Sequence, residues 1–142
     1  MFDTSHLHPM LVHFPIALIV VGFLADFISL IFKKEQCLSK AGLYLMILGT
    51  LGAIAAVLTG EFFTKELAGE AENVQETHEL FASITMYTMI VAILIRFFLI
   101  YTKREVSNLK WFVFALYGIG TISVSITGFY GGTLVYKFLI GL

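Results

Sequence analysis

The chain has 142 residues, with nine basic and ten acidic side chains, and 58% of its residues are hydrophobic. Its charged share of 13% is about half that of an ordinary soluble domain, and its mean hydropathy is +0.90. This composition excludes a soluble globular enzyme, a disordered chain and a nucleic-acid-binding protein, because it offers neither a polar surface nor a basic face for phosphates. The length allows one domain, and the single cysteine, Cys37, excludes an internal disulfide and a thiolate metal cluster.

Apolar stretches account for most of the chain, and each holds at least ~20 residues, enough for a helix to cross the hydrocarbon core. They run from Met10 to Phe32, Ala41 to Phe63, His78 to Tyr101 and Leu109 to about Val135. Each is predicted to be helical, because backbone groups in lipid must be paired within their own segment. Short loops make neighbouring spans antiparallel, so the sequence predicts an all-α fold, a single four-helix transmembrane bundle over residues 1–142.

The first stretch is predicted to be a retained helix and not a cleaved signal peptide. The residues before it include Asp3 and no Lys or Arg, its apolar run is too long, and no small-residue cleavage site follows Phe32.

The charges of the loops predict the orientation of the bundle. Basic residues flank the first loop (Lys33, Lys34, Lys40) and the third (Lys103, Arg104, Lys110), whereas the middle loop carries Glu66, Glu70, Glu72 and Glu76 against Lys65. By the positive-inside rule the first and third loops face the cytoplasm. Both termini are then expected on the outer, periplasmic side of a bacterial cytoplasmic (inner) membrane.

All four histidines are predicted to lie at this outer end. His6 and His8 precede the first span, His13 lies about one turn inside it, and His78 begins the third span. Because the first and third helices of such a bundle are usually diagonal neighbours, we expect His13 and His78 to face each other across its axis.

The register of the first helix leaves a second choice open. Asp26 is 18 residues from His8, which is five full turns, so a straight helix aligns His8 and not His13 with Asp26. Pro9 and Pro15 disturb that spacing, because proline interrupts the helical hydrogen bonds. We prefer His13 as the partner of His78, since it lies inside the span, and keep His8 as the alternative.

The second and fourth spans carry small residues at the same depth in the membrane as the histidines. They form stripes at helical spacing: Gly49, Ala53, Ala56 and Gly60 on one, and Gly118, Thr121, Ser125, Gly128 and Gly132 on the other. A flat macrocycle such as haem b needs two axial imidazoles and small residues along its faces. The sequence therefore suggests a haem held by His13 and His78, with Gly60, Gly128 and Gly131 beside it.

This pattern favours an electron-transfer or redox subunit of a larger membrane complex, which would exchange electrons with a quinone or an outer-face cytochrome. One alternative is a structural or accessory subunit without a cofactor, in which the small residues only let helices approach closely. A second alternative is a zinc or copper ion on His6, His8, His13 or His78, helped by Glu61 or Glu79. No hydrolase motif is visible, so we expect no independent catalytic activity; the expected partners are lipids and other subunits.

At the opposite end, Asp26 and Arg96 are the charged residues well inside spans. Asp26 lies ~24 Å along its helix from Met10, and Arg96 lies ~27 Å along its helix from His78. The two helices run in the same direction, so the sequence predicts an ion pair near the cytoplasmic side, where a lone buried charge is costly.

The N-terminal run His8-Pro9-Met10-Leu11-Val12-His13-Phe14-Pro15, together with Gly60, His78 and the run from Gly131 to Tyr136, resembles a known pattern. It is similar to that of small four-span bacterial membrane proteins grouped as domain of unknown function 2231. The resemblance covers nearly the whole chain and implies a four-span membrane fold.

Overall fold

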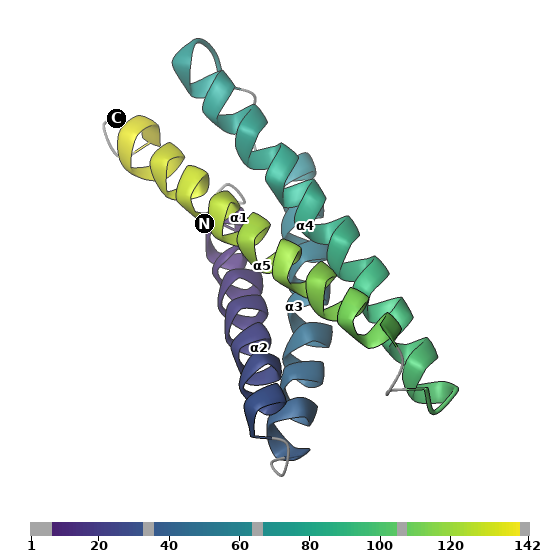
Figure 1. Cartoon of the computed structure of the whole chain (residues 1–142). Coiled ribbons are helices and arrows are strands. Elements are labelled where there is room, and N and C mark those ends of the chain that lie inside the picture. The colour runs from purple at the N-terminus through teal and green to yellow at the C-terminus, as the bar shows by residue number, and fades with distance from the viewer. Residues whose placement is uncertain (1–6, 33–35, 64–66, 105–107, 140–142) are drawn as a thin grey trace.

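The computed structural model describes residues 7–32, 36–63, 67–104 and 108–139, and within these ranges every regular element is a helix (Figure 1). In chain order the elements are α1 (Leu7–Leu11), α2 (His13–Ile31), α3 (Gln36–Phe63), α4 (Glu70–Tyr101), α5 (Asn108–Thr133) and a π-helical end, η2 (Leu134–Leu139). The fold is therefore all-α, as the sequence predicts.

Four helical segments are long and apolar enough to cross a membrane: His13–Ile31, Gln36–Phe62, Glu70–Tyr101 and Asn108–Phe138. They form two antiparallel hairpins, since α2 packs most extensively on α3 and α4 on α5 (Figure 1). Smaller contacts of α2 with α5 and of α3 with α4 join the hairpins, which leaves α2 and α4 on the diagonal. The predicted four-helix transmembrane bundle is confirmed.

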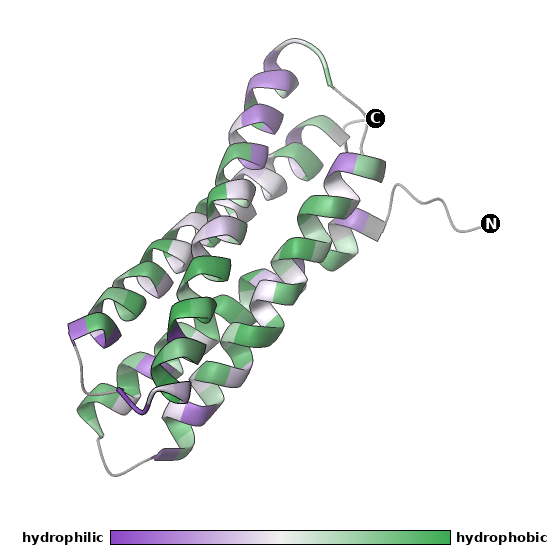
Figure 2. Cartoon of the chain, turned by 90° about the vertical axis from the view of Figure 1, so that its right-hand side faces the viewer, coloured by the Kyte–Doolittle hydropathy of each residue, from purple (hydrophilic) through white to green (hydrophobic). Residues whose placement is uncertain are grey.

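The helices extend beyond the apolar stretches that hydropathy detects. α3 begins at Gln36 and not near Ala41, and α4 begins at Glu70, two turns before His78. Figure 2 shows these hydrophilic helix ends at either limit of an apolar central band. Their backbone hydrogen bonds continue the helix, whereas hydropathy reports only the part that suits the hydrocarbon core.

The first span is interrupted at Val12, between α1 and α2. Pro15 has no N–H to donate to the Leu11 carbonyl, so the regular hydrogen-bond ladder fails at this point. The Val12 amide still donates to the His8 carbonyl at 3.1 Å, which ties α1 to α2 despite the break. Pro15 itself is buried, and a Cβ added to Gly52 of α3 would lie 3.3 Å from its Cδ.

The core is narrow and lies where the four long helices meet. Ile19, Met46, Met89 and Tyr117, one from each long helix, have no solvent exposure. By contrast, large apolar side chains such as Phe129 stand on the outside, 72% exposed, as expected of a surface that faces lipid.

Glycines let α2 and α3 approach closely. A Cβ on Gly42 would lie 3.0 Å from Cβ of Asp26 and 3.1 Å from the Gly22 carbonyl oxygen, and one on Gly49 would lie 2.7 Å from Cγ1 of Ile19. Small residues at such a crossing are the usual means of helix association in membranes.

The ends of α4 use backbone conformations with positive φ. Gly69, at φ 72°, precedes the helix, and Lys103, at φ 54°, follows it. The Arg104 amide donates to the Leu99 carbonyl at 3.0 Å, which closes the C-terminus in the manner of a Schellman motif. This position normally suits glycine, so Lys103 occupies it at a cost.

Candidate functional site

Two histidines meet across the bundle where α1 approaches α4. The ring centroids of His8 and His78 are 6.1 Å apart, and their planes are nearly perpendicular, at 87°. His78 is 7% exposed and His8 is partly buried. We call these two residues the histidine pair.

Hydrogen bonds assign the protons on both rings. Nδ1 of His78 lies 2.9 Å from the Thr127 carbonyl oxygen, which can only accept, so this nitrogen carries the hydrogen. Nδ1 of His8 lies 3.2 Å from Oγ1 of Thr59, whose hydroxyl already donates to the backbone of α3 through Ala55 and Ala56. The Thr59 oxygen therefore accepts from Nδ1 of His8. In the neutral form, the His78 ring therefore keeps its lone pair on Nε2.

Glycines pack directly against both rings. A Cβ on Gly60 of α3 would lie 3.0 Å from Cε1 of His8, and one on Gly131 of α5 would lie 3.1 Å from Cε1 of His78. A side chain at either position would compete with a ring for space. Gly128, which the sequence places beside the same site, faces Ile16 of α2 instead, with a Cβ-to-Cδ1 distance of 3.1 Å.

The structure corrects the preferred pairing of the histidines. The ring beside His78 is that of His8, whereas His13 is exposed. His8 and Asp26 both have their partners on α4, His78 and Arg96, which agrees with the five-turn spacing of a straight helix. His6 lies outside the described residues.

Burial lowers the pKa of His8 below its ordinary value, and the neighbouring His78 lowers it further. A hydrogen bond to the Ala56 carbonyl and the charge of Glu79 act in the opposite direction. The balance keeps His8 neutral at neutral pH, the state in which imidazole binds metals.

Within the described part of the chain, His8 and His78 are the side chains that this site offers to a metal ion. Across the described ranges, no group of three or more His, Cys, Asp or Glu side chains is placed to hold a metal ion. Zinc sites in proteins normally use three or four protein ligands, whereas a haem iron takes only two axial ones.

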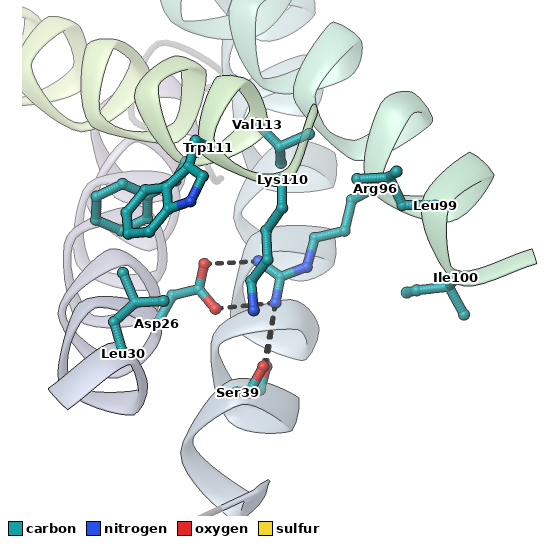
Figure 3. Close-up of a pocket in the computed structure, with 10 residues that line it drawn as sticks. Asp26, Leu30, Ser39, Arg96, Leu99, Ile100, Lys110, Trp111 and Val113 are labelled. Atoms are coloured by element: carbon teal, nitrogen blue, oxygen red, sulfur yellow. Dashed lines mark hydrogen bonds and ion pairs between the residues drawn. The ribbon is translucent and has the colours of Figure 1, made fainter. Parts of the chain in front are cut away.

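The second polar site lies at the other end of the bundle, between α2 and α4. Arg96 donates from Nη1 to Oδ2 of Asp26 at 2.7 Å and from Nη2 to Oδ1 at 2.9 Å, which is the ion pair that the helix register predicts. The side chains are 14% and 11% exposed. Figure 3 shows Ser39 of α3 below the guanidinium, with its carbonyl 3.4 Å from Nη2.

Sequence reasoning missed the hydroxyl contacts between the two ends. Ser123 of α5 donates to the Phe81 carbonyl of α4 at 2.9 Å, and the fully buried Tyr117 donates to the Gly42 carbonyl at 3.4 Å. Their signal in the sequence is only a polar residue inside an apolar span, which does not reveal the partner. Thr50, Thr85 and Thr127 each donate to the carbonyl one turn earlier, so these hydroxyls are satisfied locally.

Comparison with known families supports the membrane assignment. The family described as "Predicted membrane protein (DUF2231)" matches residues 4–142, nearly the whole chain. No curated protein and no solved structure matches the chain. With four membrane-length helices in one bundle and a family match over almost its full length, the chain belongs to the DUF2231 family of predicted membrane proteins.

Proposed function

We propose that this chain is a b-type haem subunit of a bacterial cytoplasmic membrane complex, in which His8 and His78 would hold the haem. The observation that carries the proposal is the histidine pair itself: two imidazoles from different helices, both hydrogen-bonded through Nδ1, with Nε2 of His78 left as a potential ligand. Ligating histidines usually have this arrangement, because a bond to the far ring nitrogen fixes the tautomer and the ring plane.

The position of the rings supports the same assignment. His8 and His78 would hold the group between them, because rings from two different helices lie side by side at this end of the bundle. Their centroids are 6.1 Å apart. Gly60 and Gly131 present no side chain beside these rings, which lets both imidazoles pack directly against α3 and α5.

The cofactor would supply a one-electron redox centre at this end of the bundle. Lys40, Lys103, Arg104 and Lys110 all belong to the helix ends near Asp26 and Arg96, which favours that end as cytoplasmic and the histidine pair as periplasmic. A single centre at one face does not conduct across a layer about 30 Å thick. We therefore assign the partner to the outer face, as a quinone or a cytochrome.

A reduced-minus-oxidised absorption spectrum of the purified protein, expressed with haem in excess, tests this proposal. We expect a Soret difference band at one haem per chain in the wild type, and its loss in His8→Ala and in His78→Ala. His13→Ala is the matched control, because it removes an exposed histidine five residues from His8 and should keep the band. A colourless wild type, or loss of the band in His13→Ala alone, would refute the proposal.

A further inference from the structure

A pocket of about 60 Å³ opens beside the Asp26–Arg96 ion pair, at the end of the bundle remote from the histidine pair. Its polar lining is Asp26, Ser39, Arg96 and Lys110. Its apolar walls include Leu99, Val113 and Phe114. A water molecule needs roughly 10–15 Å³ of such space, so the pocket has room for a larger polar group.

The charges that line the pocket do not cancel. Arg96 is paired with the Asp26 carboxylate, and Lys110 adds a second cation. Among the residues that the structure describes, Lys110 forms no ion pair with a carboxylate. Figure 3 shows its side chain extending from α5 toward the Asp26–Arg96 pair and not away from the bundle. The pocket thus carries a net positive charge and suits an anion.

The pocket lies at the end of the bundle, at the level expected for lipid headgroups. Ser39 and Lys110 stand near the beginnings of α3 and α5, and Ile100 stands near the end of α4, so all three belong to helix ends on one side of the bundle. Trp111, at the rim, is 61% exposed. Tryptophan at a span end is typical of the interface between headgroups and hydrocarbon.

We propose that this pocket binds the phosphate of an anionic phospholipid, with Lys110 and the paired Arg96 facing the phosphate and the acyl chains on the apolar wall beside Trp111. Basic pockets between transmembrane helices are the usual form of such headgroup sites. The apolar wall and the position at a span end distinguish this occupant from a free anion, which needs neither. The proposal is independent of haem binding, because it uses residues at the opposite end of the bundle.

Trp111 is the only tryptophan in the sequence, so its fluorescence reports on this pocket alone. We would titrate the protein in detergent micelles with brominated phosphatidylglycerol or brominated phosphatidylcholine and measure quenching of Trp111 fluorescence. Phosphatidylglycerol is expected to quench at about fivefold lower mole fraction, the effect of one lysine on one lipid charge. Lys110→Gln should remove this preference without changing the helical signal, because Lys110 is exposed and outside the core.

Lys40→Gln is the matched control, because Lys40 lies at the same end of the bundle and does not line the pocket. It should retain the preference. Equal loss of preference in both variants would overturn the proposal in favour of diffuse surface attraction. Replacing chloride with inorganic phosphate at constant ionic strength should leave the quenching unchanged; if phosphate abolishes the preference, the site takes a free anion and the lipid assignment is wrong.

Discussion

Removing one partner of the Asp26–Arg96 ion pair should destabilise the bundle far more than removing both. The two groups share hydrogen bonds of 2.7 and 2.9 Å and are almost fully buried. In Asp26→Leu the guanidinium loses its counter-charge, and in Arg96→Met the carboxylate does. Breaking a buried pair in this way costs about 3–5 kcal/mol, because it leaves an uncompensated charge in a medium of low polarity.

The double variant Asp26→Leu/Arg96→Met leaves no charge behind. Replacing a buried ion pair with apolar side chains of similar volume is often neutral or stabilising, so we expect its free energy of unfolding to lie within about 1 kcal/mol of the wild type. With each single variant costing about 3 kcal/mol or more, the coupling energy from the double-mutant cycle should then be about 5 kcal/mol or more.

The assay is reversible unfolding in mixed micelles with increasing dodecyl sulfate, followed by circular dichroism. Glu70→Gln is the control, because it breaks the exposed pair between Glu70 and Lys137, whose charged atoms are 3.5 Å apart and which should contribute at most about 1 kcal/mol. If the single variants unfold within 1 kcal/mol of the wild type, or the double variant shows the sum of their effects, the reasoning fails.

The remaining predictions concern glycine packing, a helix end and pH. Gly131→Ala should destabilise the protein by about 1 kcal/mol, because the new Cβ would lie 3.1 Å from the His78 ring, which a hydrogen bond holds in place. Gly132→Ala should not, because no atom lies within 4 Å of the new Cβ, and thermal melts compare the two variants. Lys103→Gly should raise stability by about 1 kcal/mol in the same melts, because it relieves a positive φ. The pKa of His8 is lowered from 6.5, so haem-free protein should have its full stability above about pH 6.5 and lose stability as the pH falls toward the folded-state pKa. In thermal melts between about pH 7.5 and 5.5, the melting temperature should depend less steeply on pH in His8→Gln than in the wild type.

The membrane spans could be predicted from the sequence because hydropathy and length together leave few alternatives. The helix limits could not, since the first turns of α4 are polar and their helical state depends on hydrogen bonds that hydropathy ignores. The pairing of Asp26 with Arg96 follows from equal depth on two parallel helices, and a buried charge has few possible partners.

The histidine pair shows where sequence reasoning reaches its limit. Spacing alone placed His8 in register with Asp26, but the effect of Pro15 on that register was not predictable. The structure places the ring of His8, and not that of the exposed His13, beside His78, so the preferred pairing is wrong and the alternative is the one observed. Gly60 and Gly131 lie against the rings, where the sequence predicts small residues, whereas Gly128 faces Ile16 of α2.

The histidine pair and the Asp26–Arg96 ion pair join the same two halves of the molecule, one contact at each end. His8 and Asp26 belong to the half that ends with α3, and His78 and Arg96 belong to the half that begins with α4. Sliding one half along the other by a single residue, about 1.5 Å, would misalign both contacts together. Fragments 1–66 and 67–142, co-expressed as separate chains, should therefore reassemble in one alignment. The contacts at the two ends of the molecule together fix the position of one half along the other.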